Sequence, residues 1–152
     1  LKIKINEQTF FIAHGDGLGP GDLGYKFIKK VFRNRICQFL FALIHPSFGL
    51  SVANYFSKSS RSYTGKSDEK YLKKENEWLY LFCKDYLNNE HMDYFIFGHR
   101  HLPMEIGLKE GAKYLNLGEW INFHTYGTYD GQKAFLSTWK EGVTSSFKGV
   151  IE

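Results

Sequence analysis

Two short apolar segments, each followed at once by histidine and glycine, constrain the fold of this chain more than any other feature. Tyr94–Phe97 is apolar throughout and leads into Gly98–His101. Far upstream, Thr9–Ala13 leads into His14–Asp16. Short apolar runs bounded by turn residues are typical of buried strands. Because imidazole is a common ligand of Zn, Mn and Fe, two such strands predict a metal site at one edge of a sheet.

The segment between these two strands is predicted to be helical. Apolar residues at steps of three and four predict helices over Tyr25–Ile44 and Asp68–Leu87. Pro46 is expected to end the first of them. Leu50–Phe56 predicts a second, short helix, and residues 57–67 are expected to form a polar connector.

The predicted strands lie toward both ends of the chain. The dipeptide at 130–131, Asp-Gly, predicts a tight hairpin turn. The order of strands, helices, strand and β-rich end predicts an α/β fold with an inserted helical pair. The expected strands are Lys2–Ile5, Thr9–Ala13, Met92–Phe97, Tyr114–Leu117, Ile121–Tyr129 and Lys133–Trp139.

The composition indicates a folded domain with unevenly distributed charge. Of the 152 residues, 43% are hydrophobic and 18% aromatic, which excludes a disordered tail. The net charge is +4, yet residues 26–66 contain eight Lys and Arg and no Asp or Glu. A basic, aromatic segment of this kind suits an anionic partner such as a phosphorylated substrate, a lipid headgroup or a nucleic acid.

The cysteines and the hydropathy argue against two further classes of protein. Cys37 and Cys83 each lie in an apolar helical pattern, where buried, reduced thiols are expected. The absence of a C-x-x-C pair argues against a thiolate zinc site. No apolar run reaches the roughly 18 residues needed to span a membrane.

The histidines also allow simpler structural interpretations. His99 and His101 could be exposed loop residues, and His14 could be a core histidine satisfied by backbone groups. The repeated strand-then-histidine unit favours metal binding for these three over the simpler alternatives. Structural or solvent-exposed positions are expected for the others, namely His45, His91 and His124.

A metal site that hydrolyses phosphate compounds needs more than histidines. Two-ion hydrolysis normally requires a bridging carboxylate and further oxygen ligands. The available oxygen donors near the two motifs are Asp16, Asp22, Asn116 and Glu119. None is spaced as an evident bridge, so the residues alone predict a partial site beside a basic, apolar helical segment.

These motifs together resemble a known superfamily. Gly98–His101 matches the G-H-x-H motif, and His14–Asp16 the H-G-D motif, of calcineurin-like metallophosphoesterases. Asp22 and Tyr25 match the entry into a helical lid, and Leu117–Trp120 matches a Leu-Gly-acid-Trp element. Over nearly its full length the chain resembles the C-terminal part of such an enzyme, and most of all the UDP-2,3-diacylglucosamine pyrophosphatases of lipid A synthesis.

The resemblance implies a fold and a metal site. Residues 1–152 would form the C-terminal part of one four-layer αββα sandwich domain, with a helical lid inserted over about residues 21–67. Two divalent ions are expected, with Mn²⁺ as the favoured metal. His14 and His99 would bind one ion and His101 the other.

The resemblance also implies a substrate and a location. The lid would enclose the acyl chains of UDP-2,3-diacylglucosamine, which would be hydrolysed to UMP and 2,3-diacylglucosamine 1-phosphate. A cytoplasmic protein is expected, with peripheral attachment to the inner membrane left open. The implied substrate contacts are Asp22, Tyr25, Lys58 and Arg61.

The chain departs from the superfamily pattern in one large respect. The motifs D-x-H, G-D and G-N-H, which precede H-G-D in the superfamily and supply its bridging aspartate, are absent. We therefore expect a fragment of a longer enzyme, with the catalytic residues in the preceding part. The alternatives are a metallophosphoesterase for another phosphate compound and a non-catalytic module for membrane surfaces. No nucleic-acid recognition motif is present, so that partner is not expected.

Overall fold

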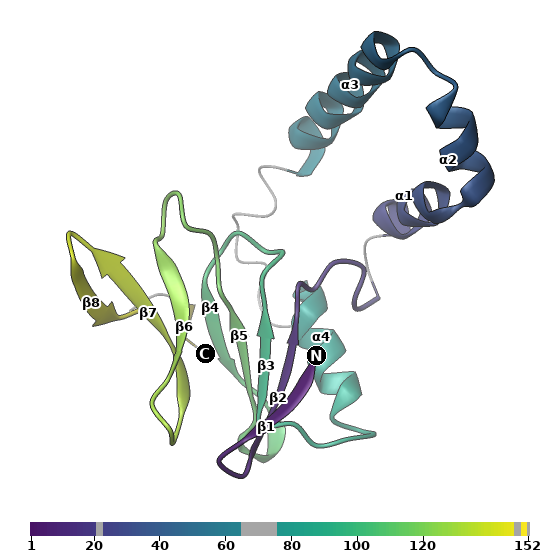
Figure 1. Ribbon diagram of the computed structural model, residues 1–152. Coiled ribbons are helices and arrows are strands. Elements are labelled where there is room, and N and C mark those ends of the chain that lie inside the picture. The colour runs from purple at the N-terminus through teal and green to yellow at the C-terminus, as the bar shows by residue number, and fades with distance from the viewer. Residues whose placement is uncertain (21–22, 65–75, 148–149, 152) are drawn as a thin grey trace.

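The chain forms a mixed α/β structure in which two β-sheets and one helix build the core (Figure 1). The computed structural model describes residues 1–20, 23–64, 76–147 and 150–151, without the side chains of residues 25, 60–64 and 150–151. These sheets and helices confirm the α/β class predicted from the sequence.

Within the described residues, the larger sheet has six strands, with three parallel neighbours at its centre. Its spatial order is β1, β2, β3, β5, β4 and β9. β2 pairs parallel with β3, and β3 pairs parallel with β5, whereas the β1–β2 and β4–β5 pairs are antiparallel. The strands are β1 Lys2–Ile5, β2 Gln8–Ala13, β3 Tyr94–Phe97, β4 Met104–Gly107, β5 Lys113–Asn116 and β9 Val150–Ile151.

The smaller sheet is an antiparallel meander of β6 Thr125–Tyr129, β7 Ala134–Lys140 and β8 Val143–Ser146. The hairpin predicted at residues 130–131 joins β6 to β7. Asp130 closes it, because its carboxylate accepts the backbone N–H groups of Gln132 and Lys133 at 2.8 Å each. Sequence patterns missed β4, β8 and β9, which are short or lack a strong apolar alternation.

The core consists of three layers. Helix α4, Trp78–Tyr86, packs Leu79 and Cys83 onto one face of the larger sheet. The smaller sheet packs Ala134 and Leu136 onto the other face. Cys83 is fully buried, as predicted, and burial raises the pKa of its thiol far above the ordinary range. The fourth layer of the expected sandwich is not among the described elements.

Among the described residues, three helices lie between β2 and α4, and they depart from the predicted boundaries. The single helix predicted over Tyr25–Ile44 is instead α1, Leu23–Arg33, and α2, Arg35–Ala42. The break occurs at Asn34, whose side chain accepts the backbone N–H groups of Ile36 and Cys37. Asparagine is a favoured N-cap, and this local capping begins a new helix where the apolar spacing alone predicted continuity.

Helix α3, Pro46–Thr64, corrects two further predictions. Proline occupies its first position, where its missing N–H is not needed, so Pro46 begins a helix as well as following one. The helix continues through most of the predicted polar connector at 57–67, because serine and lysine lower helix propensity only slightly. Within the predicted helix Asp68–Leu87, residues 68–75 lie outside the described part, and α4 begins at Trp78.

The strand predicted over Ile121–Tyr129 is also too long, because β6 begins only at Thr125. The carboxylate of Glu119 accepts the backbone N–H groups of Ile121 and Asn122 at 2.7 and 2.8 Å. A side chain that satisfies successive backbone N–H groups favours a turn over a strand.

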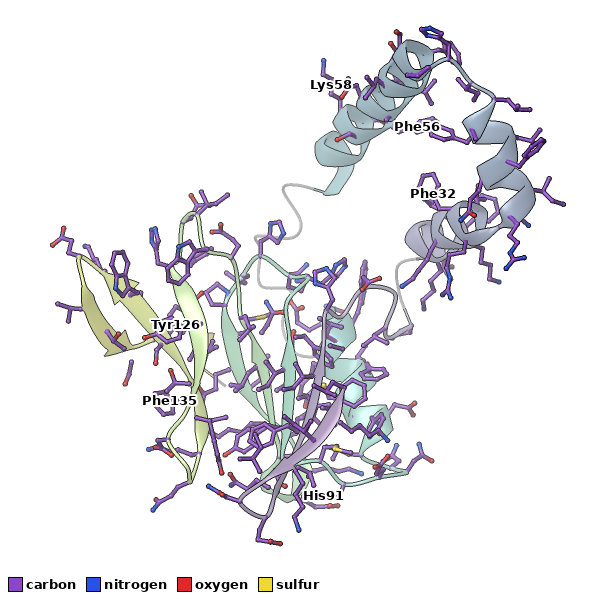
Figure 2. All side chains as sticks on the ribbon, viewed as in Figure 1. Phe32, Phe56, Lys58, His91, Tyr126 and Phe135 are labelled. Atoms are coloured by element: carbon purple, nitrogen blue, oxygen red, sulfur yellow. The ribbon has the colours of Figure 1, made fainter. Side chains whose placement is uncertain are left out.

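The apolar side chains of α1, α2 and α3 remain largely exposed. The three helices form an arc that lies apart from the sheets, and Figure 2 shows Phe32 and Phe56 on its inner side. Cys37 is only partly buried, in contrast to its predicted burial. The large apolar side chains exposed on these helices are Leu23, Phe27, Ile28, Val31, Phe32, Ile36, Phe39, Leu40, Phe41, Phe48, Leu50, Tyr55 and Phe56.

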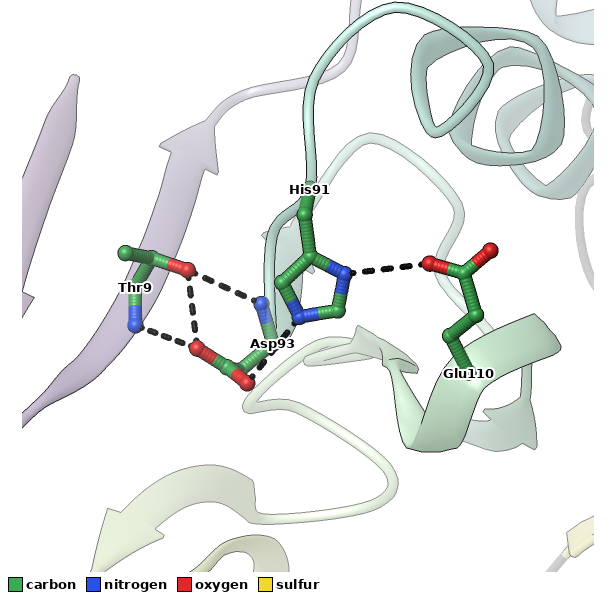
Figure 3. A network of polar contacts seen from close by, with 4 residues as sticks. All are labelled: Thr9, His91, Asp93 and Glu110. Atoms are coloured by element: carbon green, nitrogen blue, oxygen red, sulfur yellow. Dashed lines mark hydrogen bonds and ion pairs between the residues drawn. The ribbon is translucent and has the colours of Figure 1, made fainter.

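A polar network fixes the register of the central strands at their amino ends (Figure 3). Asp93 accepts hydrogen bonds from the backbone N–H and the hydroxyl of Thr9, at 2.7 and 2.8 Å. His91 lies between Asp93 and Glu110, at 3.3 and 3.5 Å. Burial acts to raise the pKa of Asp93, but the hydrogen bonds from Thr9 and the contact with His91 outweigh it and lower that pKa.

We predict that Asp93→Asn lowers the free energy of unfolding at pH 7 by about 1 kcal/mol, since Asp93 is partly exposed. A depressed carboxyl pKa stabilises the fold above the ordinary value of about 3.9 and ceases to do so as the pH falls through the lowered value. Urea titrations of the full-length protein should therefore show the difference from wild type vanishing as the pH falls through the lowered pKa of Asp93. Asp85→Asn, at an exposed position on α4, serves as the control, and a pH-independent difference would contradict the prediction.

Candidate functional site

The two predicted motifs meet at one edge of the larger sheet. β2 ends at Ala13 and β3 at Phe97, and these residues are paired in the parallel register. His14 follows Ala13 directly, and His99 follows Phe97 after Gly98. Their ring centroids lie 5.4 Å apart with the rings nearly perpendicular. The Gly98 N–H donates to the His14 carbonyl at 3.0 Å, so the two motifs are also joined through the backbone.

The turn that carries His99 is unusual for a residue with a side chain. His99 has a φ of 52°, and the Arg100 N–H donates to the Gly98 carbonyl at 2.6 Å across it. A non-glycine residue in this left-handed region is disfavoured by about 1–2 kcal/mol. Strained backbone held in place by its surroundings is common at ligand-binding sites.

Asn116 supports this turn from the neighbouring strand. It ends β5 and is fully buried, and its amide Nδ2 donates to the carbonyls of Arg100 and Leu102 at 2.5 and 2.7 Å. Its Oδ1 has no hydrogen-bond partner among the described residues. From the sequence, Asn116 is a candidate oxygen ligand of a metal. In the structure its side-chain amide donates to backbone carbonyls of the loop that carries His99 and His101.

The other predicted oxygen donors are differently placed. Asp16 follows His14 by two residues in the sequence. Its Oδ2 forms an ion pair with Lys29 of α1 at 2.7 Å. Glu119 caps the turn before β6. Desolvation acts to raise the pKa of Glu119, but the backbone N–H groups of Asn122 and Ile121 outweigh it and lower that pKa. Asp22 lies outside the described residues.

The geometry fits part of a metal site. Imidazole nitrogens that share one ion lie about 2.0–2.1 Å from it, and two perpendicular rings with neighbouring centroids can meet that requirement. Within residues 1–20, 23–64, 76–147 and 150–151, however, no three His, Cys, Asp or Glu side chains gather closely enough to hold an ion. His101 follows the same turn and is exposed.

A basic groove adjoins the histidine edge. It lies between the loop at Asp16–Leu18 and helix α1, with a volume of about 820 Å³. Lys30 and Arg33 are exposed along it, and Phe27 contributes an apolar wall. The sequence identified these bases as part of a basic segment but did not single them out, because only the fold places α1 against the loop.

Of the substrate contacts predicted on the helices, Lys58 is the one whose side chain the structure describes. Lys58 is exposed on α3, on the side away from α2 (Figure 2). Tyr25 lies in α1 and Arg61 in α3, and their side chains are outside the description, as is the whole of Asp22. No described helix combines the length and apolar character needed to cross a bilayer.

The strain at His99 leads to a prediction about stability. With metal removed by a chelator, His99→Gly should be more stable than His99→Ala by about 1 kcal/mol, because glycine adopts positive φ without a Cβ penalty. At His101, whose φ is not positive, the order should reverse, since glycine there only adds freedom to the unfolded chain. Urea unfolding of the four full-length variants measures both differences, and the same order at both positions would contradict the prediction.

Comparison with known proteins gives one informative relative. No family model matches the chain. The chain is 29% identical over 153 residues to UDP-2,3-diacylglucosamine hydrolase of Porphyromonas gingivalis (strain ATCC BAA-308 / W83). The alignment covers 93% of this chain but 58% of the relative, so the chain spans less than two thirds of that protein's length. This similarity supports a metallophosphoesterase-like relationship.

Proposed function

We propose that the full-length protein is a metal-dependent hydrolase of a phosphoric anhydride or ester. The observation that carries the proposal is the meeting of His14 and His99, with ring centroids 5.4 Å apart, at the carboxyl ends of two parallel strands. Such an edge commonly holds ligands in α/β proteins. The hydrolase similarity of the chain supports the same reaction class.

In this proposal the histidines hold two divalent ions, with Mn²⁺ as the favoured metal. His14 and His99 hold one ion and His101 the other. When bound, such ions lower the pKa of water and neutralise charge on phosphoryl oxygens. Asn116 keeps the histidine loop in place through the Arg100 carbonyl. No residue of this chain is assigned as the carboxylate that joins the ions.

The proposed substrate is UDP-2,3-diacylglucosamine, which is cleaved to UMP and 2,3-diacylglucosamine 1-phosphate. The name of the Porphyromonas gingivalis relative supports this substrate class. The groove beside Lys30 and Arg33 supplies positive charge for a phosphate group. The exposed apolar side chains of the helical arc, such as Phe32 and Phe56, suit acyl chains. On this view α1–α3 act as the lid of a four-layer sandwich in a cytoplasmic enzyme.

The substrate proposal predicts that the full-length protein releases UMP from UDP-2,3-diacylglucosamine in the presence of Mn²⁺. Removing residues 23–64 should abolish this release, because the apolar helices would no longer hold the acyl chains. Chromatographic detection of UMP measures it. Activity on a soluble phosphate compound that survives removal of the helices would instead favour another phosphate substrate, and vesicle binding without metal uptake would favour the membrane-surface alternative.

The metal assignment predicts that His99→Ala and His101→Ala each lower the bound Mn²⁺ and reduce activity at least 100-fold, as expected when a metal ligand is removed. His45→Ala is the matched control, because His45 is exposed in the link between α2 and α3, which lie apart from the sheets (Figure 1). Elemental analysis of the full-length variants gives the metal content. Unchanged metal content in the folded His99 and His101 variants would refute the assignment.

A further inference from the structure

The residue between the two histidines of the G-H-x-H turn forms a buried ion pair. Arg100, the residue between His99 and His101, is 8% exposed, and Glu77 is 1% exposed. The Arg100 Nη2 lies 3.2 Å from the Glu77 Oε1. Charged side chains are seldom buried to this degree, so the position of this pair needs a physical reason.

Glu77 is an unusual residue for its place in the fold. It occupies the N-cap of α4, where a side chain normally accepts a hydrogen bond from the first turn of the helix. Its side chain makes no such bond and extends to Arg100 instead. Because α4 is packed onto the sheet through Leu79 and Cys83, the start of the helix, where Glu77 lies, is held in place.

Arg100 is held from two directions. Glu77 binds its guanidinium from α4, and Asn116 donates to its backbone carbonyl from the end of β5. These two contacts fix the residue that separates His99 from His101. They also oppose relaxation of the strained turn at His99, where φ is 52°.

Stability alone does not account for the ion pair. Replacing a buried ion pair by apolar residues of similar size is often neutral or stabilising. An arginine whose guanidinium is held by a helix and whose backbone carbonyl is held by a strand does, however, fix the direction of its two neighbours along the chain. Outer contacts of this kind commonly change metal affinity 10–100-fold when they are removed.

We propose that Glu77 and Arg100 are positioning residues that aim His99 and His101 at the two ions. The inference rests on the proposed function, since it requires that these histidines bind metal. In this proposal Glu77 and Arg100 are not themselves ligands and act through the two histidines.

The test is an Mn²⁺ titration of the full-length protein, followed by electron paramagnetic resonance, beside thermal unfolding of the metal-free form. The double variant Glu77→Met/Arg100→Met should unfold near the wild-type temperature yet bind Mn²⁺ at least tenfold more weakly. Arg100→Lys, which keeps the charge but loses the planar guanidinium, should fold and also bind more weakly. The control is Glu105→Met/Lys113→Met, which removes a part-buried ion pair of 2.7 Å between β4 and β5.

The outcomes separate the two proposals. Weaker Mn²⁺ binding in each of the two variants that folds, with the control unchanged, supports the positioning role. Wild-type Mn²⁺ affinity in either folded variant overturns that role and leaves the metal site standing. If the double variant does not fold, Arg100→Lys decides alone. A wild-type protein that takes up no Mn²⁺ overturns both the positioning role and the proposed function.

Discussion

The parallel pairing of β2 with β3 is the constraint on which the rest of the site depends. It places Ala13 beside Phe97, so that the residues following each strand leave the sheet at the same edge. The network of Thr9, His91 and Asp93 fixes this register from the amino ends of the same strands. A slip of one residue would turn every side chain of a strand to the opposite face and separate the two motifs.

The core supports this pairing from both sides. α4 covers one face of the larger sheet, and the smaller sheet covers the other, so the central strands are buried and accurately placed. Functional turns can be strained when their supports are rigid. The turn at His99 is held by the end of β5 through Asn116 and lies against the start of α4 through Arg100. The proposed chemistry therefore depends on α4 and β5, which contribute none of the proposed metal ligands.

The helical arc contrasts with this core. Its apolar side chains are exposed, and α1 is tied to the site loop by polar contacts, from Lys26 to the Gly19 carbonyl and from Lys29 to Asp16. Exposed apolar surface of this extent is characteristic of binding surfaces. The arrangement brings a basic groove to the histidine edge and leaves an apolar face available to a hydrophobic ligand.

The sequence by itself determined the α/β class, the central strands and the strand-then-histidine units, because these are encoded in local hydrophobic patterns and turn residues. It could not place the break at Asn34 or the start of β6, which depend on single side chains capping backbone N–H groups. Only the tertiary structure decided that His14 adjoins His99 and that Glu77 reaches Arg100. These contacts join residues far apart in the chain, and strand pairing and packing, rather than local pattern, create them.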